Sequence, residues 1–94
     1  MGGIMAKVSF TSLLLRFFPD LKTEEVSAVN VRELITELDK KYEGLSSYLI
    51  EENGGLRQHV NIFINGNMIN DRVNLSDKIT SQDNINIIQA LSGG

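Results

Sequence analysis

Polar and apolar positions alternate in four stretches of the chain, which predicts strands with one buried face. These stretches are residues 7–10, 25–29, 60–64 and 85–87. The connection between the first two contains a Pro-Asp turn signal, and we expect those two strands to form an antiparallel hairpin.

The period changes to that of a helix after the second predicted strand. Apolar side chains then recur at helical spacing, at Val31, Leu34, Ile35, Leu38 and Tyr42. Asn30 stands at the N-cap position and Glu33 follows three residues later, close to a capping box. Gly44 suits a left-handed stop. The pattern therefore predicts one amphipathic helix, followed by a short helical turn at 45–50.

An Asn65-Gly66 pair follows the third predicted strand and is a strong hairpin-turn signal. One helix and four or five strands bury their apolar sides only when the helix packs on one face of the sheet. The sequence therefore predicts an α+β fold of the β-grasp (ubiquitin-like) type with a mixed sheet. We expect this domain to span residues 6–91, between a disordered N-terminal tail at 1–5 and a flexible tail at 92–94.

Two apolar side chains are expected on the sheet face turned away from the helix. If Ile62 and its alternate neighbours point toward the helix, Phe63 points away. In the last strand, inward-pointing Ile85 and Ile87 place Ile88 on the same side as Phe63. This pair is either a partner-binding patch or two of the scattered apolar residues that every protein surface carries.

Composition excludes several kinds of chemistry. The 94 residues carry a net charge of −3 and no cysteine, so disulfides, zinc–thiolate sites and thiol nucleophiles are excluded. The single histidine, His59, excludes a multi-histidine metal site, and a surface or strand-end histidine is the favoured interpretation. We expect no bound metal. Adjacent acidic pairs at 24–25 and 51–52 do not support general acid–base catalysis, because neighbouring strand residues point to opposite faces.

Charge and hydropathy also limit the partners and the location. No basic stretch is long enough to bind a nucleic-acid backbone, and no apolar run is long enough to span a bilayer. The first residues lack the apolar core of a signal peptide. We therefore expect a cytoplasmic protein that binds neither nucleic acid nor membrane.

The last predicted strand runs into Gly93-Gly94. A β-grasp chain with this ending resembles the ubiquitin-like sulfur carriers, which include the small subunit of molybdopterin synthase and the thiamine-biosynthesis carrier. The resemblance covers nearly the whole domain, and its most specific parts are residues 60–66, 83–88 and 93–94. Residues 41–45 and 55–62 look most like the carrier for cysteine synthesis. Such tails often hold a proline where this chain has Gln89.

The resemblance implies that the reacting group is the Gly94 carboxylate. A partner, an adenylating enzyme of the ubiquitin-activating kind, would activate it with ATP, and a sulfur donor would then leave a thiocarboxylate. The carrier itself would bind no cofactor. Gly93 and Gly94 lack Cβ atoms and suit a narrow channel, with Leu91 and Ser92 extended at its mouth.

Further partners follow from the same resemblance. We expect a sulfur-accepting synthase or large subunit, and in the cysteine pathway a metallopeptidase that later releases the amino acid. There are three alternatives to a sulfur carrier, of which one is open and two are less favoured. A protein modifier joined to lysines through Gly94 begins with the same adenylate and is open. A plain binding module and an enzyme in its own right are less favoured.

Overall fold

The computed structural model describes residues 5–89. Along these residues the elements are β1 (Ala6–Phe10), α1 (Ser12–Leu15), β2 (Glu24–Val26), α2 (Val31–Lys41), α3 (Leu45–Leu49), β3 (Val60–Ile64), β4 (Asn67–Met68) and β5 (Asn84–Gln89). The expected tails fall mostly outside the described residues, so the domain boundaries stay predictions.

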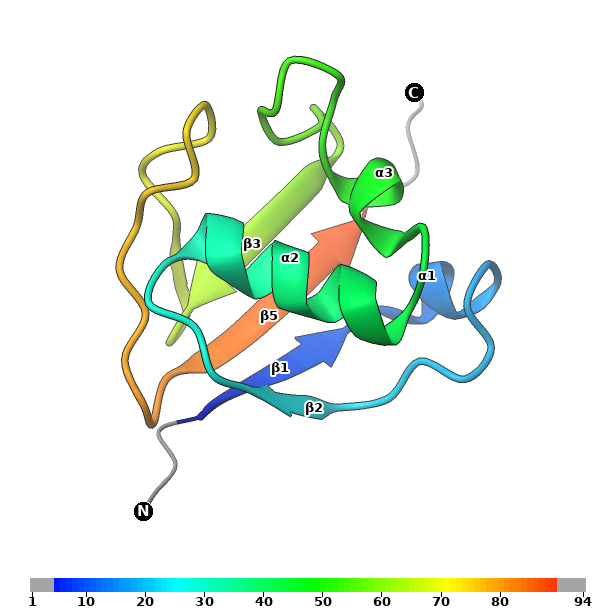
Figure 1. Ribbon diagram of the computed structural model, residues 1–94, viewed down its shortest axis with the longest axis horizontal. Helices are drawn as coiled ribbons and strands as arrows, with labels where there is room; N and C mark the ends of the chain where they lie inside the picture. The colour runs from blue at the N-terminus through cyan, green and yellow to red at the C-terminus, as the bar shows by residue number, and fades with distance from the viewer. Residues whose placement is uncertain (1–4, 90–94) are drawn as a thin grey trace.

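The strands form one mixed sheet in the order β2-β1-β5-β3-β4. The central pair β1–β5 is parallel and the other neighbouring strands are antiparallel. Figure 1 shows α2 lying across one face of this sheet. The predicted α+β, β-grasp architecture is confirmed, and so is the β1–β2 hairpin. No helix within residues 5–89 is long and apolar enough to cross a membrane.

Helix α2 begins where the capping residues predict. The Asn30 side chain accepts a hydrogen bond from the Glu33 N–H at 2.8 Å. Glu33 in turn accepts from the Val29 N–H at 2.8 Å, one residue further back than in a standard capping box. One orphan donor of the helix start, the Glu33 N–H, is thereby satisfied, and the Val29 N–H that precedes the N-cap is paired as well.

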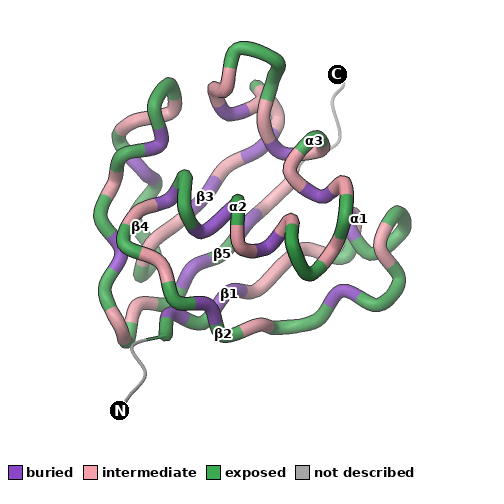
Figure 2. Tube along the Cα trace, in the orientation of Figure 1, coloured by how far each residue is buried: buried purple, intermediate pink, exposed green. Residues whose placement is uncertain are grey.

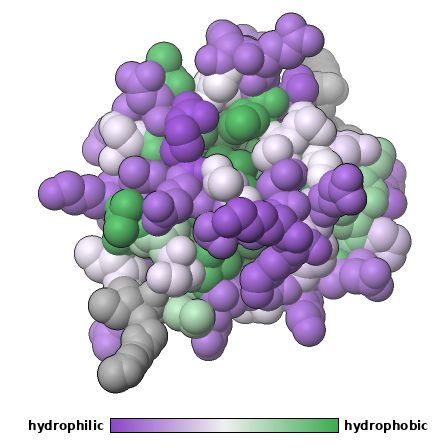
Figure 3. Space-filling model, viewed as in Figure 1, coloured by the Kyte–Doolittle hydropathy of each residue, from purple (hydrophilic) through white to green (hydrophobic). Residues whose placement is uncertain are grey.

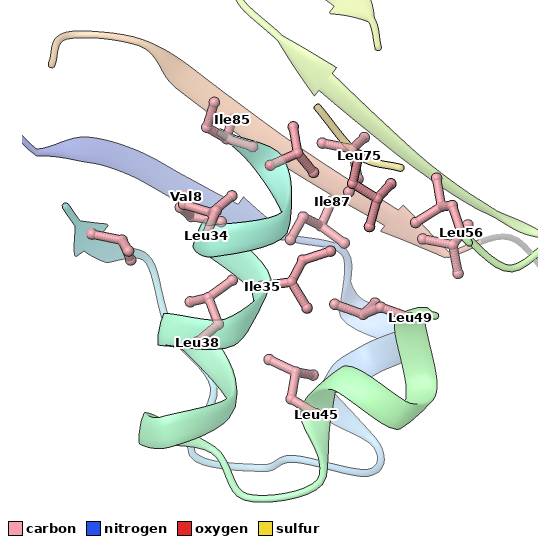
Figure 4. Close-up of a cluster of buried hydrophobic side chains, with 14 of the residues drawn as sticks. Val8, Leu34, Ile35, Leu38, Leu45, Leu49, Leu56, Leu75, Ile85 and Ile87 are labelled. Atoms are coloured by element: carbon pink, nitrogen blue, oxygen red, sulfur yellow. The ribbon is translucent and has the colours of Figure 1, made fainter. Parts of the chain in front are cut away.

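The core lies between α2 and the sheet. Purple segments in Figure 2 follow the inner faces of α2, β3 and β5, and Figure 4 shows side chains of α2 and α3 meeting those of the central strands. The side chains that are 0% exposed are Val8, Leu14, Val31, Leu34, Leu38, Leu45, Leu49, Val60, Ile62, Leu75 and Ile87. No polar or charged residue is buried as a whole among the described residues. Burial of this apolar surface is therefore the main term that holds α2 against the sheet.

Helix α2 ends at Lys41 with Tyr42 as its C-cap. The predicted left-handed stop, Gly44, lies two residues further on and is the N-cap of α3. Its φ of 93° is left-handed, a conformation that a residue with a Cβ rarely adopts. The Asp39 carboxylate accepts hydrogen bonds from the Gly44 N–H at 3.1 Å and the Ser46 N–H at 2.9 Å. The bond from Ser46 is the largest cause that lowers the pKa of Asp39.

Two local features differ from expectation. The apolar run after β1 forms the four-residue helix α1, which the sequence pattern did not predict because a run this short has no readable period. Strand β2 covers only Glu24–Val26 and stops short of the predicted 29. At its start, Glu24 accepts a hydrogen bond from the Tyr42 hydroxyl and lies 3.1 Å from the Lys41 ammonium. These contacts connect β2, at the edge of the sheet, to the C-terminal end of α2.

Candidate functional site

The pairing of β3 with β5 fixes which side chains face away from α2. The ladder runs without a bulge from Ile64 opposite Ile85 to Val60 opposite Gln89. Because Ile62 is buried against the helix, alternation places Phe63 on the opposite face of the sheet. Ile88 lies there too, opposite Asn61. The predicted orientation of Phe63 and Ile88 is confirmed, whereas their role in binding stays a prediction.

Phe63 and Ile88 line one shallow pocket on this outer face. The pocket has a volume of about 250 Å³, and Ser9 and Asn86 supply part of its polar edge. Met68 of β4 pairs directly with Phe63 and is 50% exposed. We call Phe63, Met68 and Ile88 the outer patch. Sequence reasoning missed Met68, although the two-residue turn at 65–66 fixes its register opposite Phe63.

Arg72 provides a cationic rim beside the outer patch. Its guanidinium donates to Asn61 Oδ1 at 2.9 Å and to the Arg57 carbonyl at 2.8 Å. Asn61 is the cross-strand neighbour of Ile88, so the charge is held next to the apolar surface. Apolar centres with polar rims are the usual composition of protein–protein interfaces.

The turn between β3 and β4 is held by side-chain hydrogen bonds. Asn65 has φ 53° and Gly66 has φ 86°, the left-handed pair that a type I′ turn requires. Asn65 donates to Asp83 Oδ1 at 2.8 Å and accepts from the Asn84 N–H at 2.8 Å. The pKa of Asp83 is lowered chiefly by the hydrogen bond that its carboxylate accepts from the Thr80 N–H, and next by the hydrogen bond from the Asn65 amide. The backbone that carries Phe63 and Met68 is thus fixed before any partner binds.

The described residues hold no candidate metal site. No group of three or more His, Cys, Asp or Glu side chains within residues 5–89 is placed to hold a metal ion. His59 directly precedes β3 and is partly exposed, so it is a strand-end histidine as predicted. The predicted tail positions Leu91, Ser92, Gly93 and Gly94 lie outside the described residues. The feature that the described residues present beside the last strand is the outer patch with its shallow pocket.

Sequence comparison supplies the family. The family model described as the ThiS family matches residues 12–94. The chain belongs to the ThiS family. No curated protein matches the sequence at a significant level.

Solved structures share the fold. CysO from Mycobacterium tuberculosis is 25% identical with a TM-score of 0.79, over 92% of this chain and 99% of that one. Small archaeal modifier protein 1 from Methanosarcina acetivorans is 27% identical with a TM-score of 0.76, over 98% and 100%. A chain of the BexX/CysO complex from Amycolatopsis orientalis is 22% identical with a TM-score of 0.80, over 95% and 99%. The chain therefore has the ubiquitin-like fold of sulfur carriers and protein modifiers.

Proposed function

We propose that this protein is a sulfur carrier whose Gly94 carboxylate is adenylated by a partner enzyme and converted to a thiocarboxylate. The observation that carries the proposal is the ThiS-family match, which extends through Gly93-Gly94. The β-grasp domain then provides the binding surfaces for partner enzymes, and the outer patch is one of these surfaces.

The proposed chemistry places every catalytic group on the partner. The Gly94 carboxylate attacks the α-phosphorus of ATP, pyrophosphate leaves, and an acyl-adenylate forms. A sulfur nucleophile such as hydrosulfide then forms the C–S bond and expels AMP. The carrier needs no cysteine for these steps, and its lack of cysteine is compatible with the role. The carrier supplies a terminal carboxylate without neighbouring Cβ atoms and a folded surface that orients it.

The cysteine pathway is our first choice for the acceptor, since CysO is among the structural neighbours. In that pathway the thiocarboxylate sulfur forms a C–S bond to Cβ of an activated serine derivative and the activating group leaves. The acyl group then moves from sulfur to the amino nitrogen, and a metallopeptidase hydrolyses the resulting peptide bond to release cysteine. Molybdopterin synthesis and thiamine synthesis are the other two pathways that we consider as destinations of the sulfur. Conjugation of Gly94 to lysines is the second candidate function, because small archaeal modifier protein 1 is also a neighbour.

Intact-mass measurement of the protein isolated gently from its native cell tests the proposal. A gain equal to the difference between sulfur and oxygen, located on Gly94 by sequencing the C-terminal peptide, is the expected result. A series of heavier conjugates supports the modifier instead. A chain lacking Gly93 and Gly94 is the control and gains neither. Failure of the full-length chain to show either change overturns both functions and favours a plain binding module.

The activating partner is tested separately. Incubation of the protein with the adenylating enzyme of the same organism and labelled pyrophosphate reports adenylate formation, because the reverse reaction returns label to ATP. We expect exchange that depends on the presence of Gly94.

A further inference from the structure

A second surface depression lies at the end of β5, beside the point where residues 90–94 begin. It has a volume of about 460 Å³. Its lining comes from α3, the segment before β3 and the last residue of β5, namely Ser47, Tyr48, Arg57, His59 and Gln89. In Figure 1 the arrow of β5 ends behind α3. This depression is separate from the outer patch, with which it shares no lining residue.

The charge in this depression is opposite to that of the whole chain. The protein carries a net charge of −3, yet the lining includes the guanidinium of Arg57 and no acidic side chain. Arg57 Nε donates to the Ser47 carbonyl at 3.0 Å, which anchors the guanidinium. Within residues 5–89 Arg57 forms no ion pair, even though Glu51 and Glu52 line a neighbouring depression with it. An anchored cation that forms no ion pair with the described residues is suited to bind a carboxylate of a partner.

Gln89 adds an unmet hydrogen-bonding requirement to the same place. Its side-chain Oε1 is buried and receives no hydrogen bond from any described residue. Buried polar atoms without a partner are rare, because leaving one unpaired costs about 1–3 kcal/mol. Because Gln89 lines the depression, rotation of its amide toward the opening would let a donor from a bound partner reach this oxygen and remove that cost. Gln89 is also the last residue of β5, so a contact here lies at the root of the proposed tail.

An apolar ledge adjoins the depression. The Phe17 ring centroid lies 5.0 Å from that of Tyr48, which itself lines the depression. Phe17 is 51% exposed and Leu15 is 38% exposed, although both are large apolar side chains. Figure 3 shows hydrophobic colour gathered at the edge of the molecule where Figure 1 places α1. Apolar and cationic elements therefore meet on one continuous surface.

We infer that this surface, formed by Phe17, Tyr48, Arg57, His59 and Gln89 and called here the tail-root surface, docks the adenylating enzyme at the mouth of its channel. The inference rests on the proposed function. The five residues 90–94 span at most about 17 Å when extended, so the channel mouth must lie against the end of β5. The enzyme segment that meets it carries a carboxylate for Arg57 and His59, a hydrogen-bond donor for Gln89 and an apolar side chain for Phe17.

Steady-state pyrophosphate exchange with the adenylating enzyme of the same organism tests the inference. In Arg57→Gln the KM for the carrier rises roughly tenfold, the value for one charge-assisted hydrogen bond, while kcat stays unchanged because the lost contact is made equally in ground and transition states. Lys78→Gln is the matched control. It removes one exposed positive charge beside Asn30, at the other end of α2, and we expect its KM to match the wild type.

A second variant controls for any effect of Arg57→Gln on the fold, since that substitution also removes the hydrogen bond from Arg57 to the Ser47 carbonyl. Phe17→Ser removes an exposed ring and is expected to raise the KM several-fold with an unchanged circular dichroism spectrum. Added salt should raise the KM of the wild type more than that of Arg57→Gln, because screening weakens only the charged contact.

The outcomes separate the two proposals. If the wild-type protein supports no exchange, the proposed function fails and this inference fails with it. If the wild type is active and neither Arg57→Gln nor Phe17→Ser changes the KM, the inference alone is overturned. An equal rise in KM for Lys78→Gln also overturns it, because the effect would then come from net charge.

Discussion

Substitution of Phe63 by aspartate tests whether the outer patch is a binding surface rather than part of the core. The ring lies on the sheet face away from α2, paired with Met68 on one side and Asn86 on the other. Loss of strand propensity and of one cross-strand pair lowers the free energy of unfolding by about 1–2 kcal/mol. For a domain of 94 residues this corresponds to a fall in Tm of about 4–16 °C.

Ile62→Asp is the contrasting change one residue away. Ile62 is 0% exposed, so the variant creates a cavity and buries a carboxylate, at a cost of about 4 kcal/mol or more. Domains of this size have total stabilities of only about 5–15 kcal/mol. We therefore expect Ile62→Asp to be largely unfolded under conditions in which Phe63→Asp is folded. Urea unfolding followed by circular dichroism measures both variants.

The binding consequence of Phe63→Asp is measured with the adenylating enzyme. Truncation of an aromatic residue at the centre of an interface costs about 2 kcal/mol, or roughly 30-fold in Kd. Val29→Asp is the matched control, since Val29 is a 65% exposed apolar side chain that lines no part of the outer-face pocket, and we expect its Kd to match the wild type. A Tm for Phe63→Asp as low as that of Ile62→Asp would refute the strand orientation. A folded Phe63→Asp protein with unchanged Kd would refute the role of the outer patch in activation.

Two further predictions concern stability. Asn30→Ala removes the acceptor of the Glu33 N–H and should lower the free energy of unfolding by about 1 kcal/mol; a urea midpoint equal to that of the wild type would contradict this. Asp71 accepts hydrogen bonds from the Ser76 hydroxyl and the Asn74 N–H, which lower its pKa from 3.8 to about 2. Because the folded-state pKa is the lower one, this stabilisation is present above pH 3.8 and is lost as the pH falls toward 2. Acid unfolding of Asp71→Asn should be less steep in that window, and an unchanged profile would contradict the assignment.

The elements that the sequence predicted well are those specified by neighbouring residues. Helix α2 follows from its apolar period and from Asn30, and the β3–β4 turn follows from Asn65-Gly66. The orientation of Phe63 and Ile88 followed from strand alternation once a continuous ladder was assumed. Each of these depends on contacts within a few residues along the chain or on the fixed period of a strand.

The features that escaped prediction depend on contacts between distant segments. Helix α1 has only four residues, and burial of Leu14 in the assembled core stabilises it rather than its own periodicity. The depression at the end of β5 brings residues of α3, the segment before β3 and Gln89 together. Nothing in the local pattern around Arg57 or Gln89 indicates that they meet.

The position of β5 explains how a folded domain can direct a terminal glycine. This strand is paired with β1 as far as Ile87 and with β3 as far as Gln89, so its last residue is fixed relative to both the outer patch and the tail-root surface. A partner that binds either surface therefore fixes the starting point of residues 90–94 as well. In the function that we propose, five residues span no more than about 17 Å, so a partner bound at either surface would keep Gly94 within a small volume and raise its effective concentration at the ATP site. Under that proposal the fold contributes by positioning, and the reactive groups belong to the partner enzymes.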